Sequence, residues 1–155
     1  MERISEYLQK EACLMELKAT TKEEAIRELS GHMARVGLVN DEQQFIQDLI
    51  EREKLGSTGI GHKVAIPHAP TQSVDGFVIG FARSSAGVDF AAMDGDEVNL
   101  IFAMGTNPQE LSLYLQMLSQ LSRLLRNETF RNELIHTAKT PEDVINLFKK
   151  FEKEG

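Results

Sequence analysis

Apolar residues recur at helical spacing near the N-terminus, after the short apolar segment 13–17. Thr21 is followed three residues later by Glu24, which is the pattern of a helix capping box. The apolar residues that follow keep to one side of a helix as far as Gly37: Ala25, Ile26, Leu29, Met33 and Val36. We therefore expect a helix between Thr21 and Gly37.

A second helix is expected directly afterwards. Asp41 and Gln44 have the spacing of a capping residue and its reciprocal partner. The apolar face of this segment consists of Phe45, Ile46, Leu49 and Ile50. Arg52 falls in the last turn, and the helix is expected to end near Gly56.

The centre of the chain changes from helical periodicity to the composition of strands. Residues 56–73 combine glycine, proline and polar residues around the short apolar run 64–66, which predicts a loop, a short strand and another loop. Residues 77–83 and 97–104 are rich in β-branched and aromatic residues and predict two longer strands. The run 98–104 is apolar enough to be buried on both faces of a sheet. Asp94 and Gly95 predict a turn between the two strands.

The C-terminal part returns to helical spacing. Asn107, Pro108 and Glu110 form a helix start signal, and the expected apolar stripe comprises Leu111, Tyr114, Leu118, Leu121 and Leu125. Asn127 and Thr140 predict the caps of two further helices. The buried side of the last helix is expected to contain Val144, Leu147, Phe148 and Phe151.

Helices before, between and after a set of apolar strands predict an α/β fold. The arrangement that buries all these apolar faces is a three-layer sandwich, in which helices cover both faces of a mixed β-sheet. The length of 155 residues fits a single domain, residues 1–155. With 41% hydrophobic and 26% charged residues, the composition is that of an ordinary globular protein.

The net charge of −7 argues against binding to nucleic acid or anionic lipid and favours a basic protein partner. The apolar runs are far shorter than the roughly 20 residues needed to cross a bilayer, and the first ten residues lack a signal-peptide core. We expect no membrane insertion and a cytoplasmic location. The one cysteine, Cys13, fits a reducing compartment and is expected to be buried at an edge of the core.

The densest chemical signal lies in residues 56–70, where two histidines stand six positions apart among three glycines. The segment superficially resembles a nucleotide-binding P-loop. However, His62 follows Gly61 where the P-loop has a lysine, and Lys63 precedes a valine instead of a Ser or Thr that opens a helix. The glycines still allow backbone N–H groups to approach an anion closely.

Pro67 directly precedes His68. Proline cannot donate a hydrogen bond to a sheet, and it restricts Ile66 to an extended conformation. The short strand is therefore expected to end where His68 emerges, within reach of solvent and partners. From the local chemistry alone, the default interpretation of His68 is an ordinary loop histidine.

The segment from Glu53 to His68 resembles the phosphorylation-site signature of the mannitol/fructose class of IIA domains of the phosphoenolpyruvate-dependent sugar phosphotransferase system. The signature requires an acidic or amide residue, six arbitrary positions, an apolar residue, a small residue, two further positions and then apolar-Ala-apolar-Pro-His. Glu53, the six residues after it and residues 60–68 match at every position. The similarity continues in Arg52, in residues 88–90, in the 94–95 turn and in residues 114–125.

This resemblance implies an α/β sandwich with a mixed sheet, no metal or organic cofactor, and a phosphohistidine at His68. It also implies two partners: the histidine-containing phosphocarrier HPr, or a relative, as donor, and a cysteine-bearing IIB domain as acceptor. The residue type suits a reversible carrier. A neutral imidazole is a good nucleophile near pH 7, and it also leaves phosphorus readily.

Phosphoryl transfer depends mainly on positioning and on stabilisation of charge. By the resemblance, Arg52 supplies a cation with forked donors beside the phosphohistidine. Tyr114 stands where the family commonly has a second histidine, and its hydroxyl can donate a hydrogen bond but cannot carry positive charge. Glu53 and His62 are further candidate site residues, although a glutamate at a helix end and a loop histidine are common on surfaces.

Two alternatives remain open at this point. The first is the nitrogen-type IIA protein, which uses the same histidine to report its phosphorylation state by binding other proteins. The second is a metal-dependent hydrolase built on His62, His68 and Asp75. These three residues lack the helical i, i+4 geometry and the dense ligand spacing that favour a metal site.

Overall fold

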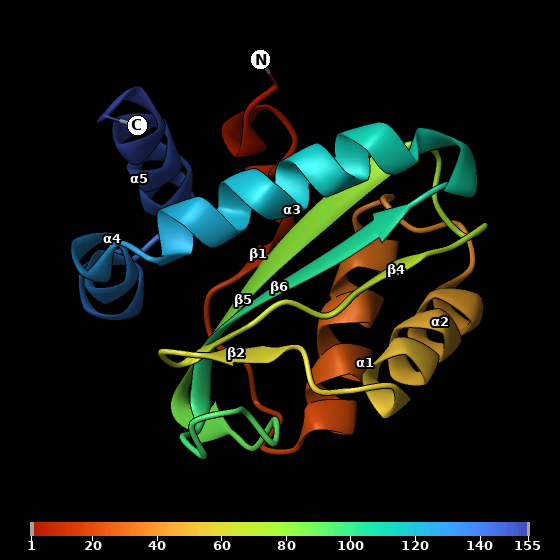
Figure 1. Ribbon diagram of the computed structural model, residues 1–155, viewed down its shortest axis with the longest axis horizontal. Coiled ribbons are helices and arrows are strands. Elements are labelled where there is room, and N and C mark those ends of the chain that lie inside the picture. Colours follow the sequence, from red (N-terminus) through yellow and green to blue (C-terminus); the bar gives the residue numbers. More distant parts are fainter. Residues whose placement is uncertain (1, 155) are drawn as a thin grey trace.

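The long antiparallel pair β5 (Phe77–Val88) and β6 (Val98–Thr106) forms the centre of the fold in the computed structural model, which describes residues 2–154 (Figure 1). The two strands pair continuously from Phe77 opposite Thr106 to Arg83 opposite Leu100. The pairing then shifts before Val88 meets Val98. β6 is buried along almost its whole length, as the apolar run 98–104 predicts.

Four short strands complete a six-stranded mixed sheet. Their bounds are β1 (Cys13–Leu14), β2 (Gly59–Gly61), β3 (Val64–Ala65) and β4 (His68–Pro70). The strand order is β1-β5-β6-β3-β2. β4 also pairs with β6, further along the strand than β3. β1 runs parallel to β5, β3 and β4 run parallel to β6, and β2 is antiparallel to β3.

Helices cover both faces of the sheet, which confirms the three-layer α/β sandwich (Figure 1). Alternate residues of β5 point to opposite faces. Val78 and Ala82 pack in one apolar cluster with α1 (Lys22–Arg35) and α2 (Glu42–Lys54). Phe77, Ile79 and Phe81 pack in the other, with α3 (Leu111–Leu125), α4 (Glu128–Asn132) and α5 (Pro141–Glu154).

Short helical turns connect these elements. Three are 3₁₀ turns, at Ile4–Glu6, Lys10–Ala12 and Pro108–Glu110, and a π-helical turn at Glu133–Thr137 continues α4. The longest helix is α3, with 15 residues. No helix within residues 2–154 combines the length and the apolar character required to span a membrane.

The helix start signals are confirmed by their hydrogen bonds. The side chain of Thr21 accepts a bond from the N–H of Glu24 at 3.4 Å, and Asp41 accepts one from Gln44 at 3.1 Å. Asn127 caps α4 in the same way. These caps satisfy N–H groups that the first helical turn leaves free.

The predicted apolar stripe of α3 is wrong at one end. Leu111 is 44% exposed, and the α-helix begins only there, after a 3₁₀ turn in which Glu110 forms no reciprocal cap. The buried side contains Tyr114, Met117, Gln120, Leu121, Leu124 and Leu125. Helical spacing identifies the side of a helix that faces the core, but it does not show which turns the core covers.

The strands β2 and β4 lie where the sequence predicts loops. Their glycines and prolines have low strand propensity. They are strands because their backbones pair with β3 and β6, which the local sequence cannot reveal. The expectation for Cys13 is confirmed, since it is 6% exposed on the edge strand β1 and burial raises the pKa of its thiol to about 12.

The glycines on the inner face of β5 and β6 allow α1 and α2 to lie close to the sheet. A Cβ atom at Gly105 would come within 2.6 Å of the Phe45 ring, and one at Gly80 within 2.5 Å of the sulfur of Met33. We expect Gly105→Ala to lower the free energy of unfolding by about 1–3 kcal/mol, because an aromatic ring cannot yield without moving its helix.

Gly80→Ala should cost less in the same urea titration, because the methionine side chain can adopt another rotamer. Equal losses for the two variants would contradict this account of the packing.

Candidate functional site

His68 is the first residue of β4 and lies at the level of Met104 on β6. β3 pairs with β6 up to Ala65, opposite Ile101, so the same register continues on both sides of Ile66 and Pro67. The strand is thus interrupted at Pro67, as expected, but it resumes at His68 instead of ending. This places the histidine on a fixed backbone rather than on a free loop.

One ring nitrogen of His68 is held by its own backbone. Nδ1 lies 2.5 Å from the carbonyl oxygen of Ile66, two residues earlier. A carbonyl oxygen can only accept a hydrogen bond, so in the neutral ring Nδ1 carries the proton. Nε2 is then the nitrogen with the free lone pair, and it is the nucleophilic atom of this side chain.

The surroundings favour the neutral imidazole. Burial lowers the pKa of His68 below its ordinary value of 6.5, and the positive charge of Arg52 lowers it further. The hydrogen bond to Ile66 and the charge of Glu53 act in the opposite direction, but the net shift is downward. The ring is therefore unprotonated, and able to act as a nucleophile, at neutral pH.

Arg52 approaches the site from the last turn of α2. Its Nη1 donates a hydrogen bond to the carbonyl oxygen of Gly56 at 3.0 Å, which holds the guanidinium against the loop that follows the helix. Its charge influences the pKa of both His68 and Tyr114. The positive charge that the family resemblance implies at Arg52 therefore acts electrostatically on both rings, while its hydrogen bond is made to the loop.

Tyr114 reaches the site from the first turns of α3. Its ring centroid lies 5.8 Å from that of His68, with the ring planes inclined at 49°. The side chain is 6% exposed, and burial raises the pKa of its hydroxyl to about 12, although the charge of Arg52 opposes that rise. The hydroxyl is therefore protonated at neutral pH and can donate a hydrogen bond.

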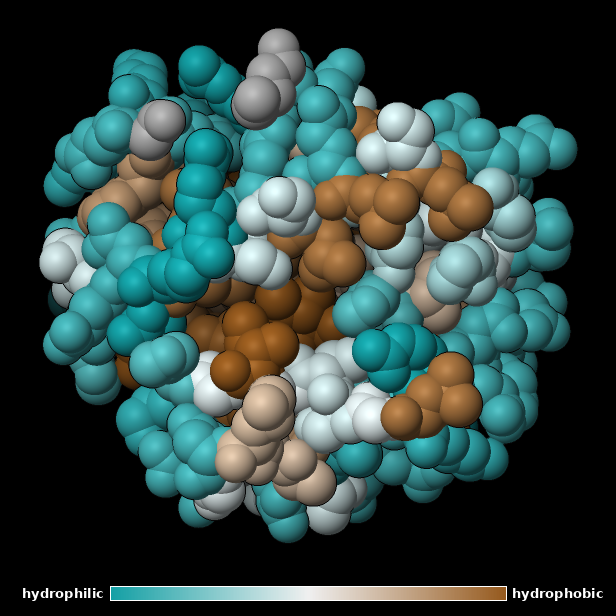
Figure 2. Space-filling model, viewed as in Figure 1, coloured by the Kyte–Doolittle hydropathy of each residue, from teal (hydrophilic) through white to brown (hydrophobic). Residues whose placement is uncertain are grey.

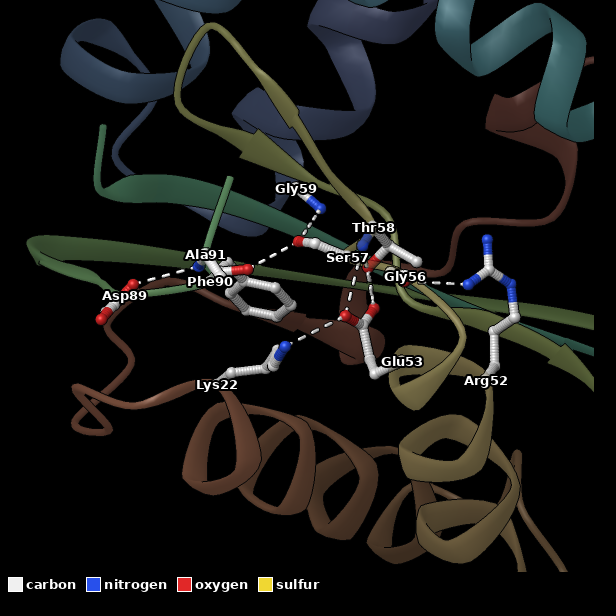
Figure 3. A network of polar contacts seen from close by, with 10 residues as sticks. All are labelled: Lys22, Arg52, Glu53, Gly56, Ser57, Thr58, Gly59, Asp89, Phe90 and Ala91. Atoms are coloured by element: carbon white, nitrogen blue, oxygen red, sulfur yellow. Dashed lines mark hydrogen bonds and ion pairs between the residues drawn. The ribbon is translucent and has the colours of Figure 1, made fainter. Parts of the chain in front are cut away.

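Glu53 is buried, although glutamates at helix ends are usually exposed. Figure 3 shows its carboxylate directed toward Lys22 and Thr58. It is 6% exposed, its Oε2 lies 3.6 Å from Nζ of Lys22 in the first turn of α1, and both carboxylate oxygens accept bonds from Thr58. Lys22 and Thr58 carry no sequence signal that would have identified them. Their role depends on the packing of α1 against α2.

His62 lies in a different part of the molecule from His68. It occupies the turn between β2 and β3, with a positive φ of 55°, and its N–H donates to Asp94 at 3.1 Å. The next residue bonds to Asn99, five positions before Met104 on β6. At about 3.3 Å per residue, this separation is roughly 16 Å. The structure therefore does not bring the two histidines together.

No group of three or more His, Cys, Asp or Glu side chains within residues 2–154 is arranged to hold a metal ion. Asp75, the third residue of the hydrolase alternative, is exposed in the loop before β5. Because His62 and His68 lie far apart, they cannot bind the same metal ion, as that alternative requires. The geometry of the described residues gives the metal-dependent hydrolase no support.

The chain resembles proteins of the sugar phosphotransferase system over almost its whole length. The model of the family "Phosphoenolpyruvate-dependent sugar phosphotransferase system, EIIA 2" matches residues 6–151. The fructose-specific EIIABC component of Bacillus subtilis is 34% identical over 97% of this chain, which spans 24% of that relative. The fructose-specific EIIA component of Haloferax volcanii is 37% identical over 84% of this chain and 86% of its own length.

Two solved structures share this fold at high similarity. The nitrogen regulatory protein IIA-Ntr of Neisseria meningitidis has a TM-score of 0.85 at 29% identity and covers 94% of this chain and 98% of its own. The mannitol IIA enzyme of Escherichia coli, solved in complex with phosphorylated IIB, has a TM-score of 0.78 at 26% identity, with 92% and 99% covered. Taken with the family match, these similarities show that the chain belongs to the EIIA type 2 family of the phosphoenolpyruvate-dependent sugar phosphotransferase system.

Proposed function

We propose that Nε2 of His68 accepts a phosphoryl group from an HPr-type phosphocarrier and passes it to the cysteine of a IIB domain, in the cytoplasm and without a cofactor. The observation that carries this proposal is the bond from Nδ1 to the Ile66 carbonyl, which leaves Nε2 as the free nucleophile. The place of His68 at the end of the matching segment 53–68, within a chain of this family, supports the same assignment.

The transfer requires one bond to form as another breaks. The lone pair of Nε2 attacks phosphorus while the nitrogen–phosphorus bond of the donor histidine breaks, and that bond's electron pair returns to the donor ring. The His68 ring gains positive character as the bond forms. The Ile66 carbonyl stabilises that charge through the hydrogen bond from Nδ1, and the reverse sequence delivers the group to the acceptor.

Arg52 and Tyr114 are the side chains suited to the moving phosphoryl group. The guanidinium offers several N–H donors and a permanent charge to the phosphoryl oxygens. The tyrosine hydroxyl offers one donor without a charge. Together they supply positioning and charge stabilisation, which are the main requirements of phosphoryl transfer.

Exposed apolar residues near the ends of α2 and α3 support a protein partner. Leu55 is 83% exposed three positions after Arg52, and Leu111 and Leu115, at 44% and 60%, stand on either side of Tyr114 in the sequence. Figure 2 shows apolar side chains gathered along α3 and in the region next to it. Apolar groups at the centre and charged groups at the rim are the usual composition of a docking surface, and the net charge of −7 favours basic partners.

A second candidate function is that of a regulatory protein of the nitrogen type. It is supported by the TM-score of 0.85 with the Neisseria IIA-Ntr structure and by the 34% identity to the nitrogen regulatory protein of Bradyrhizobium diazoefficiens. The two candidates differ in the protein with which the chain interacts after His68 is phosphorylated. Capture of partners with the wild type and with His68→Ala distinguishes them, since transport requires a IIB domain and regulation requires other proteins.

The central prediction concerns the phosphorylated atom. Incubation with phosphoenolpyruvate, enzyme I and HPr should label the protein once, with an acid-labile phosphate on Nε2 of His68. His68→Ala should abolish labelling and leave the fold intact, because the half-buried ring makes no bond beyond its own strand segment. Equal labelling of the variant, by phosphate analysis and mass spectrometry, would refute the proposal.

Replacement of Arg52 should change both the rate and the titration of His68. Because the guanidinium charge lowers the pKa of His68, Arg52→Ala should raise the midpoint toward 6.5 in an NMR titration. Transfer at pH 7 should slow by roughly 10²-fold. Arg52→Lys keeps the charge and loses the fork, so it should retain the low midpoint and show a smaller loss. Identical rates and midpoints in all three proteins would mean that Arg52 has no part in the site.

Tyr114→Phe removes a hydroxyl without changing the ring that packs against His68. Stability should change little, while phosphoryl transfer at subsaturating partner concentrations should fall, because only a hydrogen-bond donor is lost. Tyr114→His should remain active. If the phenylalanine variant transfers as fast as the wild type, the hydroxyl has no role in transfer and Tyr114 serves the core alone.

A further inference from the structure

Glu53 is a buried carboxylate that the proposed transfer does not itself use. Its side chain is 4% exposed, and its ion pair with Lys22 connects the end of α2 to the start of α1. Glu51, two positions earlier on the same helix, is exposed, and its side chain accepts hydrogen bonds from Gln47 and Lys54. A carboxylate is costly to bury unless its oxygens are fully bonded, so the partners of Glu53 indicate what it holds.

The main partner of Glu53 is Thr58, in the loop after α2 (Figure 3). The N–H of Thr58 lies 3.2 Å from each carboxylate oxygen, and its hydroxyl donates a further bond to Oε1. On the other side of the loop, Oγ of Ser57 donates to the Phe90 carbonyl at 2.6 Å. The loop is therefore fixed from two directions, and Thr58 itself is only 3% exposed.

A continuous path of hydrogen bonds leads from Thr58 to the ring of His68. The carbonyl of Thr58 accepts a bond from the N–H of Ile66 at 3.0 Å. The carbonyl of the same isoleucine accepts the bond from Nδ1 of His68 at 2.5 Å. Ile66 is 2% exposed and precedes a proline, so its backbone has little freedom to adjust independently.

The same loop also holds the cation of the site. The carbonyl of Gly56 accepts the bond from Arg52, and the N–H of Gly56 donates to the backbone carbonyl of Glu53 at 3.1 Å. The segment between Glu53 and Thr58 thus carries both the acceptor that orients Arg52 and the acceptor that positions Ile66. The side chain of Glu53, through its bonds to Thr58, anchors the end of this segment that is farther from α2.

We propose that Glu53 is a positioning residue, which sets the tautomer of His68 and the direction of Arg52 by fixing the loop 56–58 through Thr58. The proposal rests on the proposed function for its consequence in transfer. If Glu53 releases the loop, the Ile66 carbonyl loses its fixed position, and Nδ1 no longer keeps the proton preferentially. Nε2 then carries the proton in part of the population, and that part cannot attack phosphorus.

The test compares two pairs of variants by ¹⁵N NMR of the unphosphorylated imidazole. Thr58→Val removes the hydroxyl at nearly constant shape, and Thr58→Ser retains it. Glu53→Gln removes the buried charge, and Glu51→Gln makes the same change on the exposed face of α2. We expect His68 to keep its proton on Nδ1 in the wild type and both controls, and to gain an Nε2–H fraction in Thr58→Val and Glu53→Gln.

Transfer from the phosphorylated donor at saturating concentration should fall on the order of 10-fold in the same two variants and stay unchanged in the controls. Lower melting temperatures with an unchanged tautomer and an unchanged rate would overturn the proposal and leave Glu53 a purely structural residue. If Glu53→Gln fails to fold, the threonine pair decides. Because the tautomer is measured without phosphate, failure of the wild type to be labelled would refute the proposed function and not this inference.

Discussion

Backbone pairing along β6 fixes the position of His68, the residue around which the rest of the site is arranged. This strand binds β5 on one side and both β3 and β4 on the other, so the segment carrying His68 is aligned with it on either side of the proline. The register with Met104 gives the histidine a defined height in the sheet. The position of His68 therefore depends on pairing between strands that are distant in sequence, more than on the local sequence of the motif.

Opposing electrostatic effects converge on a neutral, correctly oriented imidazole. Burial and the charge of Arg52 disfavour the protonated ring, whereas the Ile66 carbonyl and Glu53 favour it. A ring that was fully solvated would be partly protonated near pH 6.5, and one without the carbonyl would have no fixed tautomer. The combination suits the proposed carrier function, in which the ring would be nucleophilic before phosphorylation and would bear positive charge after it.

The sequence predicted those features that depend on local spacing. The caps at Thr21, Asp41 and Asn127, the two long strands and the sandwich architecture all follow from periodicity and from residues that satisfy helix ends. That Arg52 and Tyr114 lie near His68 could be predicted only from the resemblance to a family. Periodicity and spacing do not place residues from separate helices around one ring.

Other features could not be predicted because they depend on contacts between elements that are distant in the sequence. β2 and β4 are strands only through their partners, Leu111 is exposed because the core ends before it, and His62 is separated from His68 by the length of the intervening strand. Glu53 is the clearest case. Its burial results from the approach of Lys22 and Thr58, neither of which is marked by any motif.

The missing side chain of Gly105 has a consequence for how the site can evolve. A Cβ atom at Gly105 would come within 2.6 Å of the Phe45 ring on α2. The same helix carries Arg52, and β4, which pairs with β6 at Gly105, carries His68. The distance at which α2 packs on the sheet therefore bears on the spacing between Arg52 and His68. A residue larger than glycine at position 105 would therefore need a smaller residue at position 45 to keep the same spacing between Arg52 and His68.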